Sequence, residues 1–186
     1  DVYKMLKLTQ LVLAKAGYDR YEISNYAKPG YTCRHNVGYW TRENYLGLGL
    51  GAASLIDNVR YSNTRELYEY IEICRELTFL PPEVFAPEEG MDAPERGWFG
   101  SNLHTEAAVV NRKAQMEEFM FLGLRMTEGI SRNEFEANFG MPIEAAYVQV
   151  LPDLQAQKLI EKREGRVYLT DRGMDVANYV MAQFLL

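Results

Sequence analysis

The residues best suited to chemistry lie together in the segment 35–40, whose sequence is His-Asn-Val-Gly-Tyr-Trp. It holds one of the two histidines of the chain, and Cys33, one of the two cysteines, comes two residues earlier. Imidazole and thiolate are the side chains that best ligate haem iron. Tyr39 and Trp40 are large apolar rings that can pack on a flat macrocycle. These residue types indicate haem as a candidate ligand.

A second interpretation of the same segment requires no ligand. A histidine–asparagine pair beside aromatic rings also forms hydrogen-bonded structural corners, and the spacing alone leaves both interpretations open. The other histidine, His104, is expected to be partly solvated in a connecting segment. Cys74 lies on the apolar face of a predicted helix, where it is expected to pack as a small side chain.

The elements that would position the segment 35–40 follow from hydrophobic spacing. Apolar residues at helical spacing predict a helix over 1–17, and alternation predicts a strand over 18–23. Residues 24–40 are polar and interrupted by proline and glycine, which predicts a loop, the usual place for binding residues. A short strand over 59–62 and a helix from about 64 to 77 are predicted next.

An apolar run with alternate glycines, residues 45–54, follows the segment 35–40 in the sequence. Alternate glycines in a strand leave one face without side chains, so a ligand, a cofactor or a packed helix must come close to that backbone. The run lacks the third glycine and the acidic partner of a dinucleotide-binding fingerprint. As a glycine motif it is therefore weak.

The second half of the chain begins with a connection rich in proline and acidic residues, 81–112, which predicts little regular structure. From residue 113 the patterns are clear. They predict three helices, the second opened by a capping box of Ser131 and Glu134, then a hairpin turning at Glu164-Gly165, then a closing helix. This order is typical of a winged-helix-like domain over 113–186. Such a domain should fold by itself, and the connection should be the preferred site of proteolysis.

Charge and composition exclude several classes of function. The chain of 186 residues carries 20 basic and 26 acidic residues, and residues 113–186 carry 8 and 11, so a nucleic-acid surface is not expected. No apolar run approaches the roughly 20 residues of a membrane span, and no signal peptide is evident. Two cysteines suit a reducing cytoplasm, and they are too few for an iron–sulfur cluster.

Several segments together resemble one family, the HemW-type haem chaperones. These are radical S-adenosylmethionine proteins related to oxygen-independent coproporphyrinogen III oxidase. The resemblance rests on Gly-Tyr at 17–18 with Tyr-Glu-Ile-Ser-Asn-Tyr-Ala-Lys-Pro-Gly at 21–30, on Cys-Arg-His-Asn at 33–36 with Tyr-Trp at 39–40, on the glycine run at 46–54, and on 116–125. It extends over most of the chain except about 81–111.

The resemblance implies a fold and a set of binding residues. Residues 1–80 would be the last strands and helices of a partial α/β barrel, 81–112 a connecting segment, and 113–186 the C-terminal domain. The family motif implies haem binding by His35, Asn36, Tyr39 and Trp40, with His35 at the haem iron. Gly49, Ala52 and Ala53 are weaker candidates for contact with S-adenosylmethionine. The implied partners are haem-accepting proteins of the cytoplasm.

The chain also departs from the family pattern, because it has no Cys-x-x-x-Cys-x-x-Cys motif for a four-iron four-sulfur cluster. It is therefore expected to be a C-terminal fragment without radical chemistry of its own. Two alternatives stay open: the tail of an oxygen-independent coproporphyrinogen III oxidase, and a protein-interaction module. A truncated barrel would leave apolar side chains uncovered, including Val12, Tyr21, Ile23, Leu46, Leu48 and Leu50. Self-association through residues 1–75 is therefore expected.

Overall fold

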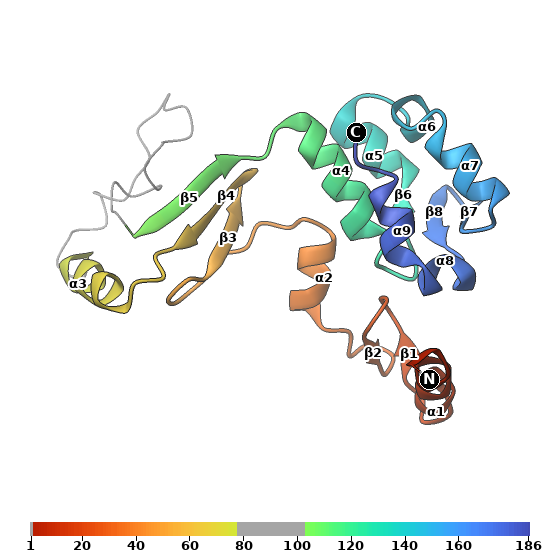
Figure 1. Cartoon of the computed structure of the whole chain (residues 1–186), viewed down its shortest axis with the longest axis horizontal. Coiled ribbons are helices and arrows are strands. Elements are labelled where there is room, and N and C mark those ends of the chain that lie inside the picture. Colours follow the sequence, from red (N-terminus) through yellow and green to blue (C-terminus); the bar gives the residue numbers. More distant parts are fainter. Residues whose placement is uncertain (1, 78–102) are drawn as a thin grey trace. The chain divides into compact units, whose positions relative to one another are not determined.

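The computed structural model describes residues 2–77 and 103–186, and it forms two compact units (Figure 1). The first unit combines residues 1–42 with 112–186, and the second contains residues 43–111. Helices and strands both contribute to the described residues, so the expected mixed α/β class is confirmed. All strand pairs among the described residues are antiparallel.

The main core of the first unit is built by its C-terminal part. Its helices are α4 (Arg112–Gly123), α5 (Arg132–Phe139), α6 (Ile143–Ala146), α7 (Val150–Ala156), α8 (Asp171–Asp175) and α9 (Ala177–Ala182). Its strands, β6 (Ile130–Ser131), β7 (Ile160–Arg163) and β8 (Arg166–Leu169), form a sheet in the order β6-β8-β7. Fully buried apolar side chains fill the space between them, among them Met120, Phe135, Leu151 and Phe184.

The local signals in this part were predicted correctly. The Ser131 hydroxyl accepts a hydrogen bond from the Glu134 amide at 3.2 Å, and Gly140 ends α5 with φ of 61°. The hairpin turns at Glu164 and Gly165, both with positive φ, as a two-residue turn requires. Two helices differ from expectation. The third helix is divided into α6 and α7, and the closing helix breaks at Val176 into α8 and α9.

The N-terminal part of the first unit begins with α1 (Val2–Lys15), which confirms the predicted helix. The predicted strand over 18–23 is largely wrong, because only β1 (Asp19–Arg20) pairs, with β2 (Tyr26–Ala27). The predicted loop over 24–40 is also wrong: β2 and the helix α2 (Arg34–Trp40) lie within it. The chain turns over residues 22–25, where the Glu22 carboxylate accepts hydrogen bonds from the Ser24 amide and the Asn25 side chain. This turn ends the strand early.

The second unit contains a three-stranded sheet and one helix. Strands β3 (Ala53–Ile56), β4 (Val59–Asn63) and β5 (His104–Val109) pair in the order β3-β4-β5, and α3 (Leu67–Leu77) confirms the predicted helix. The expectation of little regular structure over 81–112 is wrong at its end, where β5 pairs with β4. The rest of that segment up to 102 lies outside the described residues.

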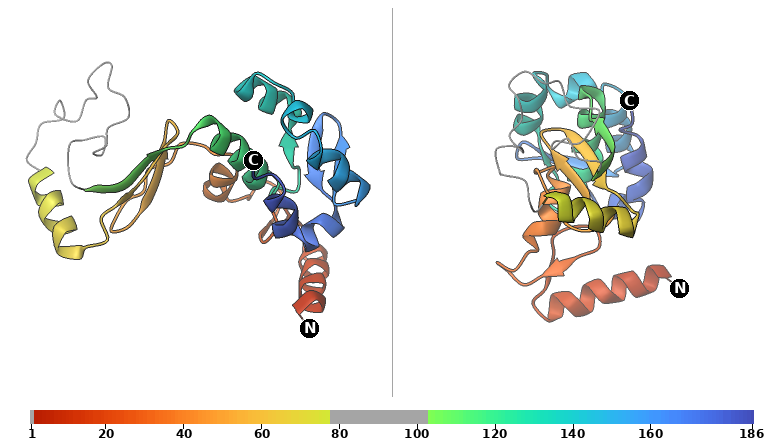
Figure 2. Two further views of the ribbon diagram at one scale, coloured as in Figure 1. Left: turned by 45° about the horizontal axis from the view of Figure 1, so that its top comes forward. Right: turned by 90° about the vertical axis from the view of Figure 1, so that its left-hand side faces the viewer.

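Apolar side chains are exposed on α1, which lies at the margin of the first unit (Figure 2). Met5, Leu8 and Val12 are each more than half exposed. Leu46 and Leu48 of the second unit are exposed as well, whereas Tyr21 and Ile23 are partly buried in the first. One ion pair, from Lys7 to Asp175 at 2.9 Å, connects α1 to α8.

The buried phenol of Tyr147 gives a test of core packing. Its side chain is 1% exposed, and its hydroxyl has no hydrogen-bond partner among the described residues. Burial, followed by the charge of Glu117, raises the pKa of Tyr147 far above its ordinary value. We expect Tyr147→Phe to leave the free energy of unfolding unchanged or to raise it by up to about 1 kcal/mol, because an unpaired polar group is removed. Phe135→Ala, the control for lost packing, should lower it by about 3–5 kcal/mol in urea titrations.

Candidate functional site

The helix α2 carries all four residues of the candidate haem motif in the first unit. His35 is exposed, and its ring lies edge-on to the ring of Tyr39 with centroids 4.6 Å apart. Residues four apart lie on the same face of a helix, so His35 and Tyr39 share one face and Asn36 and Trp40 share another. The structure therefore brings the four motif residues together on two faces of one helix.

The face with Asn36 and Trp40 turns toward the protein. The Asn36 amide donates a long hydrogen bond of 3.5 Å to the Tyr21 hydroxyl. The guanidinium carbon of Arg125 lies 4.2 Å from the centroid of the Trp40 ring. This is a close cation–π contact, well within the usual limit of about 6 Å.

Arg125 is held in turn by a buried carboxylate. Its Nη2 lies 3.3 Å from Oε2 of Glu22, whose side chain is completely buried. The other oxygen, Oε1, accepts hydrogen bonds of 2.7 Å from the Ser24 amide and from the Asn25 side chain. The carboxylate thus has three donors, which compensates for much of the cost of burying its charge.

Backbone hydrogen bonds join the same two segments. The Ile23 amide donates to the Arg125 carbonyl, and the Thr127 amide donates to the Tyr21 carbonyl, each at 3.0 Å. Glu22 and Met126 form an isolated antiparallel bridge. The segment that precedes α2 is therefore paired directly with the segment that follows α4.

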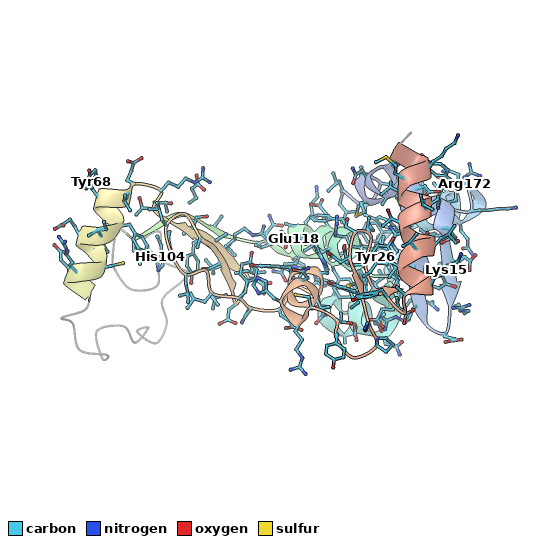
Figure 3. The ribbon with its side chains drawn as sticks, turned by 90° about the horizontal axis from the view of Figure 1, so that it is seen from below. Lys15, Tyr26, Tyr68, His104, Glu118 and Arg172 are labelled. Carbon is cyan, nitrogen blue, oxygen red and sulfur yellow. The ribbon has the colours of Figure 1, made fainter. Side chains whose placement is uncertain are left out.

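A second ion pair holds the C-terminal end of α2 against α4. Arg42 Nε donates to Oε2 of Glu118 at 2.8 Å, and the two side chains are only 10% and 9% exposed. Glu118 is labelled in Figure 3. Arg42 has φ of 58°, a backbone conformation that is uncommon for a residue other than glycine. Trp40 of the motif and Arg42, two residues after it, thus both contact the C-terminal part of this unit.

Trp40 also borders an open cavity of about 440 Å³ beside α4 and α9. Most of its lining is apolar, and Arg125 is the one charged side chain among the described residues that form it. The lining residues are Trp40, Phe121, Leu122, Arg125, Asn178, Met181, Ala182 and Leu185. Its size lies within the range of small-molecule sites.

The glycine run lies in the second unit, where backbone packs closely against Gly47 but not against Gly49. A Cβ at Gly47 would clash with the carbonyl of Ala53. The buried Asn63 donates its side-chain amide to the carbonyls of Gly47 and Gly49, at 3.3 and 2.8 Å. The candidates Gly49, Ala52 and Ala53 thus belong to a turn and to the start of β3.

His104 takes part in the same network rather than lying in a loop. Asn63 uses its amide N–H on the glycine carbonyls, so its oxygen accepts from His104 Nδ1 at 3.0 Å. Burial lowers the pKa of His104 below its ordinary value of 6.5. Figure 3 labels His104 on β5. This histidine is partly buried, which agrees with the expected partial solvation, but it lies in strand β5 and not in an irregular connection.

Sequence reasoning missed the charged residues that hold α2. Glu22, Arg42, Glu118 and Arg125 are far apart in the sequence, and no spacing rule connects them. The available signal was a charged residue within an otherwise apolar pattern, as at Glu118 on the helix over 112–123. Within the described residues, no group of three His, Cys, Asp or Glu side chains could hold a metal ion.

Comparisons with known proteins agree with the resemblance. Residues 110–176 match the HemN C-terminal domain. The chain is 34% identical over 175 residues to the Heme chaperone HemW of Lactococcus lactis, and 34% over 182 residues to that of Bacillus subtilis. These alignments cover 94% and 96% of this chain, but only 40% and 42% of the relatives.

A solved structure shows the same fold. The model superimposes on coproporphyrinogen III oxidase HemN from Escherichia coli, described as a radical SAM enzyme, with a TM-score of 0.65 and 16% identity. The match covers 97% of this chain and 40% of that one. At this identity it establishes the fold alone.

These findings first define a class: residues 110–176 match the HemN C-terminal domain, and the chain has a fold like that of part of HemN. Over most of its length the sequence is similar to the Heme chaperone HemW proteins, in agreement with the resemblance of its motifs. The chain spans about two fifths of the length of the relatives it matches.

The lowered pKa of His104 predicts a pH dependence of the second unit. In the unfolded chain His104 binds a proton near pH 6.5, whereas in the folded unit it does so only at lower pH. The stabilisation of the folded unit by neutral His104 is therefore fully present above about pH 6.5. It is lost as the pH falls through the folded pKa. We expect amide exchange in β3, β4 and β5 to accelerate between pH 6.5 and 5. In His104→Gln, which keeps a donor for Asn63, this extra acceleration should be absent.

The buried Glu22 predicts a large effect of a small substitution. In Glu22→Gln the side chain loses its charge, and its new NH₂ group faces groups that are themselves donors, such as the Ser24 amide and Arg125. The free energy of unfolding should therefore fall by about 2–4 kcal/mol. The control is Glu144→Gln, which breaks a more exposed pair of contacts to Arg132 and Lys162 at 2.9 and 3.1 Å. It should cost less than about 1 kcal/mol in the same denaturant titration. Equal effects of the two substitutions would contradict the central role of Glu22.

Proposed function

We propose that the chain is the C-terminal part of a haem chaperone of the radical S-adenosylmethionine family, which binds haem and passes it to acceptor proteins. The observation that carries the proposal is the exposed imidazole of His35 on the motif helix α2. Among the described residues its ring lies against Tyr39, and the imidazole is left accessible to a ligand. The names of the relatives support this function over that of a coproporphyrinogen oxidase.

The residues of α2 fit haem as a ligand. The His35 imidazole offers a nitrogen to the haem iron, and the adjacent edge-on ring of Tyr39 limits its rotation. We include Asn36 and Trp40 in the site because they complete the motif. Exposure on the outside of the unit would keep bound haem accessible to an acceptor protein, as transfer requires.

We attribute two further cofactors to the full-length protein. S-adenosylmethionine would lie near Gly49, Ala52 and Ala53, and this assignment rests on the resemblance alone. The four-iron four-sulfur cluster takes about four cysteine ligands, and the 186 residues of this chain include only Cys33 and Cys74. We therefore expect no radical chemistry from this chain by itself.

We further infer the architecture and setting of the chain. The sheet order β6-β8-β7 beside α4 to α7 supports a winged-helix-like domain that contacts proteins, because its net charge disfavours nucleic acid. Residues 1–80 would complete a partial barrel in the full-length protein, which we place in the cytoplasm. Among the described residues no helix is long and apolar enough to span a membrane. The exposed apolar side chains of α1 support self-association of this chain.

The proposal is tested by haemin titration of His35→Ala in the full-length protein. Loss of an iron ligand should weaken haem binding about tenfold or more, while the melting temperature stays within a few degrees, because the ring is exposed. His104→Ala is the matched control: it should leave the haem absorption band unchanged and lower the stability of the second unit, where His104 bonds Asn63. Unchanged haem affinity in the His35 variant would remove the proposed function.

A further inference from the structure

The two faces of α2 have different surroundings. His35 is exposed and contacts Tyr39, a residue of the same helix. Asn36 and Trp40 instead contact residues of other segments, Tyr21 and Arg125. Within the motif, His35 is therefore the exposed residue, whereas Asn36 and Trp40 contact residues of other segments.

One side of the Trp40 ring is closed to a macrocycle, although the residue also borders the cavity beside α4 and α9. The guanidinium of Arg125 already occupies one side of its ring, at 4.2 Å from the centroid. Its indole N–H is inaccessible to solvent and has no hydrogen-bond partner among the described residues. What holds the ring is packing and the cation–π contact, and Arg125 is itself fixed by Glu22.

We propose that the motif is divided between two roles: His35 contacts haem, whereas Asn36 and Trp40 are positioning residues through which Arg125 holds the helix. This assignment deepens the proposed function and rests on it for the identity of the ligand. The buried ion pair Arg42–Glu118 is a second contact, two residues after the end of α2. The C-terminal end of α2 is therefore fixed by contacts on both Trp40 and Arg42.

The division accounts for the spacing of Asn36 and Trp40, which are four residues apart and therefore lie on the same face of α2. An axial histidine is useful only when its ring points at a defined place, and a helix of seven residues is too short to be stable by itself. Its orientation must come from contacts with the C-terminal part of the unit. Arg125 and Glu118 lie in or directly after α4 and supply these contacts from that part.

The first experiment measures amide hydrogen exchange of residues 37–41 without haem, in wild type, Arg125→Met and Arg125→Lys. We expect exchange in Arg125→Met to be about tenfold faster, because the contacts of both Trp40 and Glu22 are lost. Arg125→Lys keeps the charge but not the planar stacking and should be intermediate. The control, Arg163→Met, removes a cation–π contact with Tyr168 in the hairpin and should not alter α2. Protection of α2 as in wild type in Arg125→Met would overturn the positioning role.

The second experiment titrates the full-length variants with haemin. Arg125→Met and Trp40→Leu should each weaken binding by about 3- to 30-fold, and the double variant should be no weaker than the worse single one. The absorption band of the saturated complexes should stay at the wild-type position, because His35 is retained. A shifted band in Trp40→Leu, or additive losses in the double variant, would place Trp40 in contact with haem and overturn the division. If His35→Ala binds haemin normally, the proposed function fails, while the exchange experiment still decides the positioning role.

Discussion

The first unit depends on one buried carboxylate, that of Glu22. A charge that is fully removed from water is tolerated only when donors surround it, and here the donors come from the Ser24 amide, the Asn25 side chain and Arg125. Satisfying the carboxylate therefore forces the chain to turn between residues 22 and 25. It also brings that turn to the end of α4, about 100 residues later in the sequence. The position of α2 follows, because Trp40 packs on the same arginine.

Because burying these charges is costly, we infer that the ion pairs fix one orientation of α2 more than they stabilise the fold. Buried ion pairs often contribute little net free energy, since desolvation offsets their attraction, but breaking one strands the remaining charge. The unit contains two such pairs, Glu22–Arg125 and Arg42–Glu118, and both join the segment around α2 to the region of α4. An apolar contact could slide by a residue, whereas these pairs fix one orientation of the helix.

The sequence predicted local structure well and non-local structure poorly. The helix α4, the cap at Ser131 and the turn at Glu164-Gly165 follow from residues within four positions of each other. The helix α2 was predicted as a loop, because its stability comes from distant contacts and Cys33 forms no side-chain cap hydrogen bond. Strand β5 was missed for the same reason, as only its pairing with β4 defines it. The motif residues could be predicted, whereas the arginine and glutamate residues that hold them could not.

The two candidate sites differ in what the fold already explains. The alternate glycines over 47–51 suggested that a ligand approaches their backbone. The backbone of Ala53 fills the space beside Gly47, and Gly49 and Gly51 have positive φ, a conformation that favours glycine. Packing and backbone conformation within the second unit thus account for the pattern without a cofactor. The opposite holds for His35, whose imidazole is exposed and contacts Tyr39 of its own helix. Two ion pairs, each with a buried carboxylate, hold the segment around α2, and His35 takes part in neither of them. Contacts among the described residues therefore account for the glycine pattern more fully than for the exposed histidine, and the proposed haem site rests on the latter.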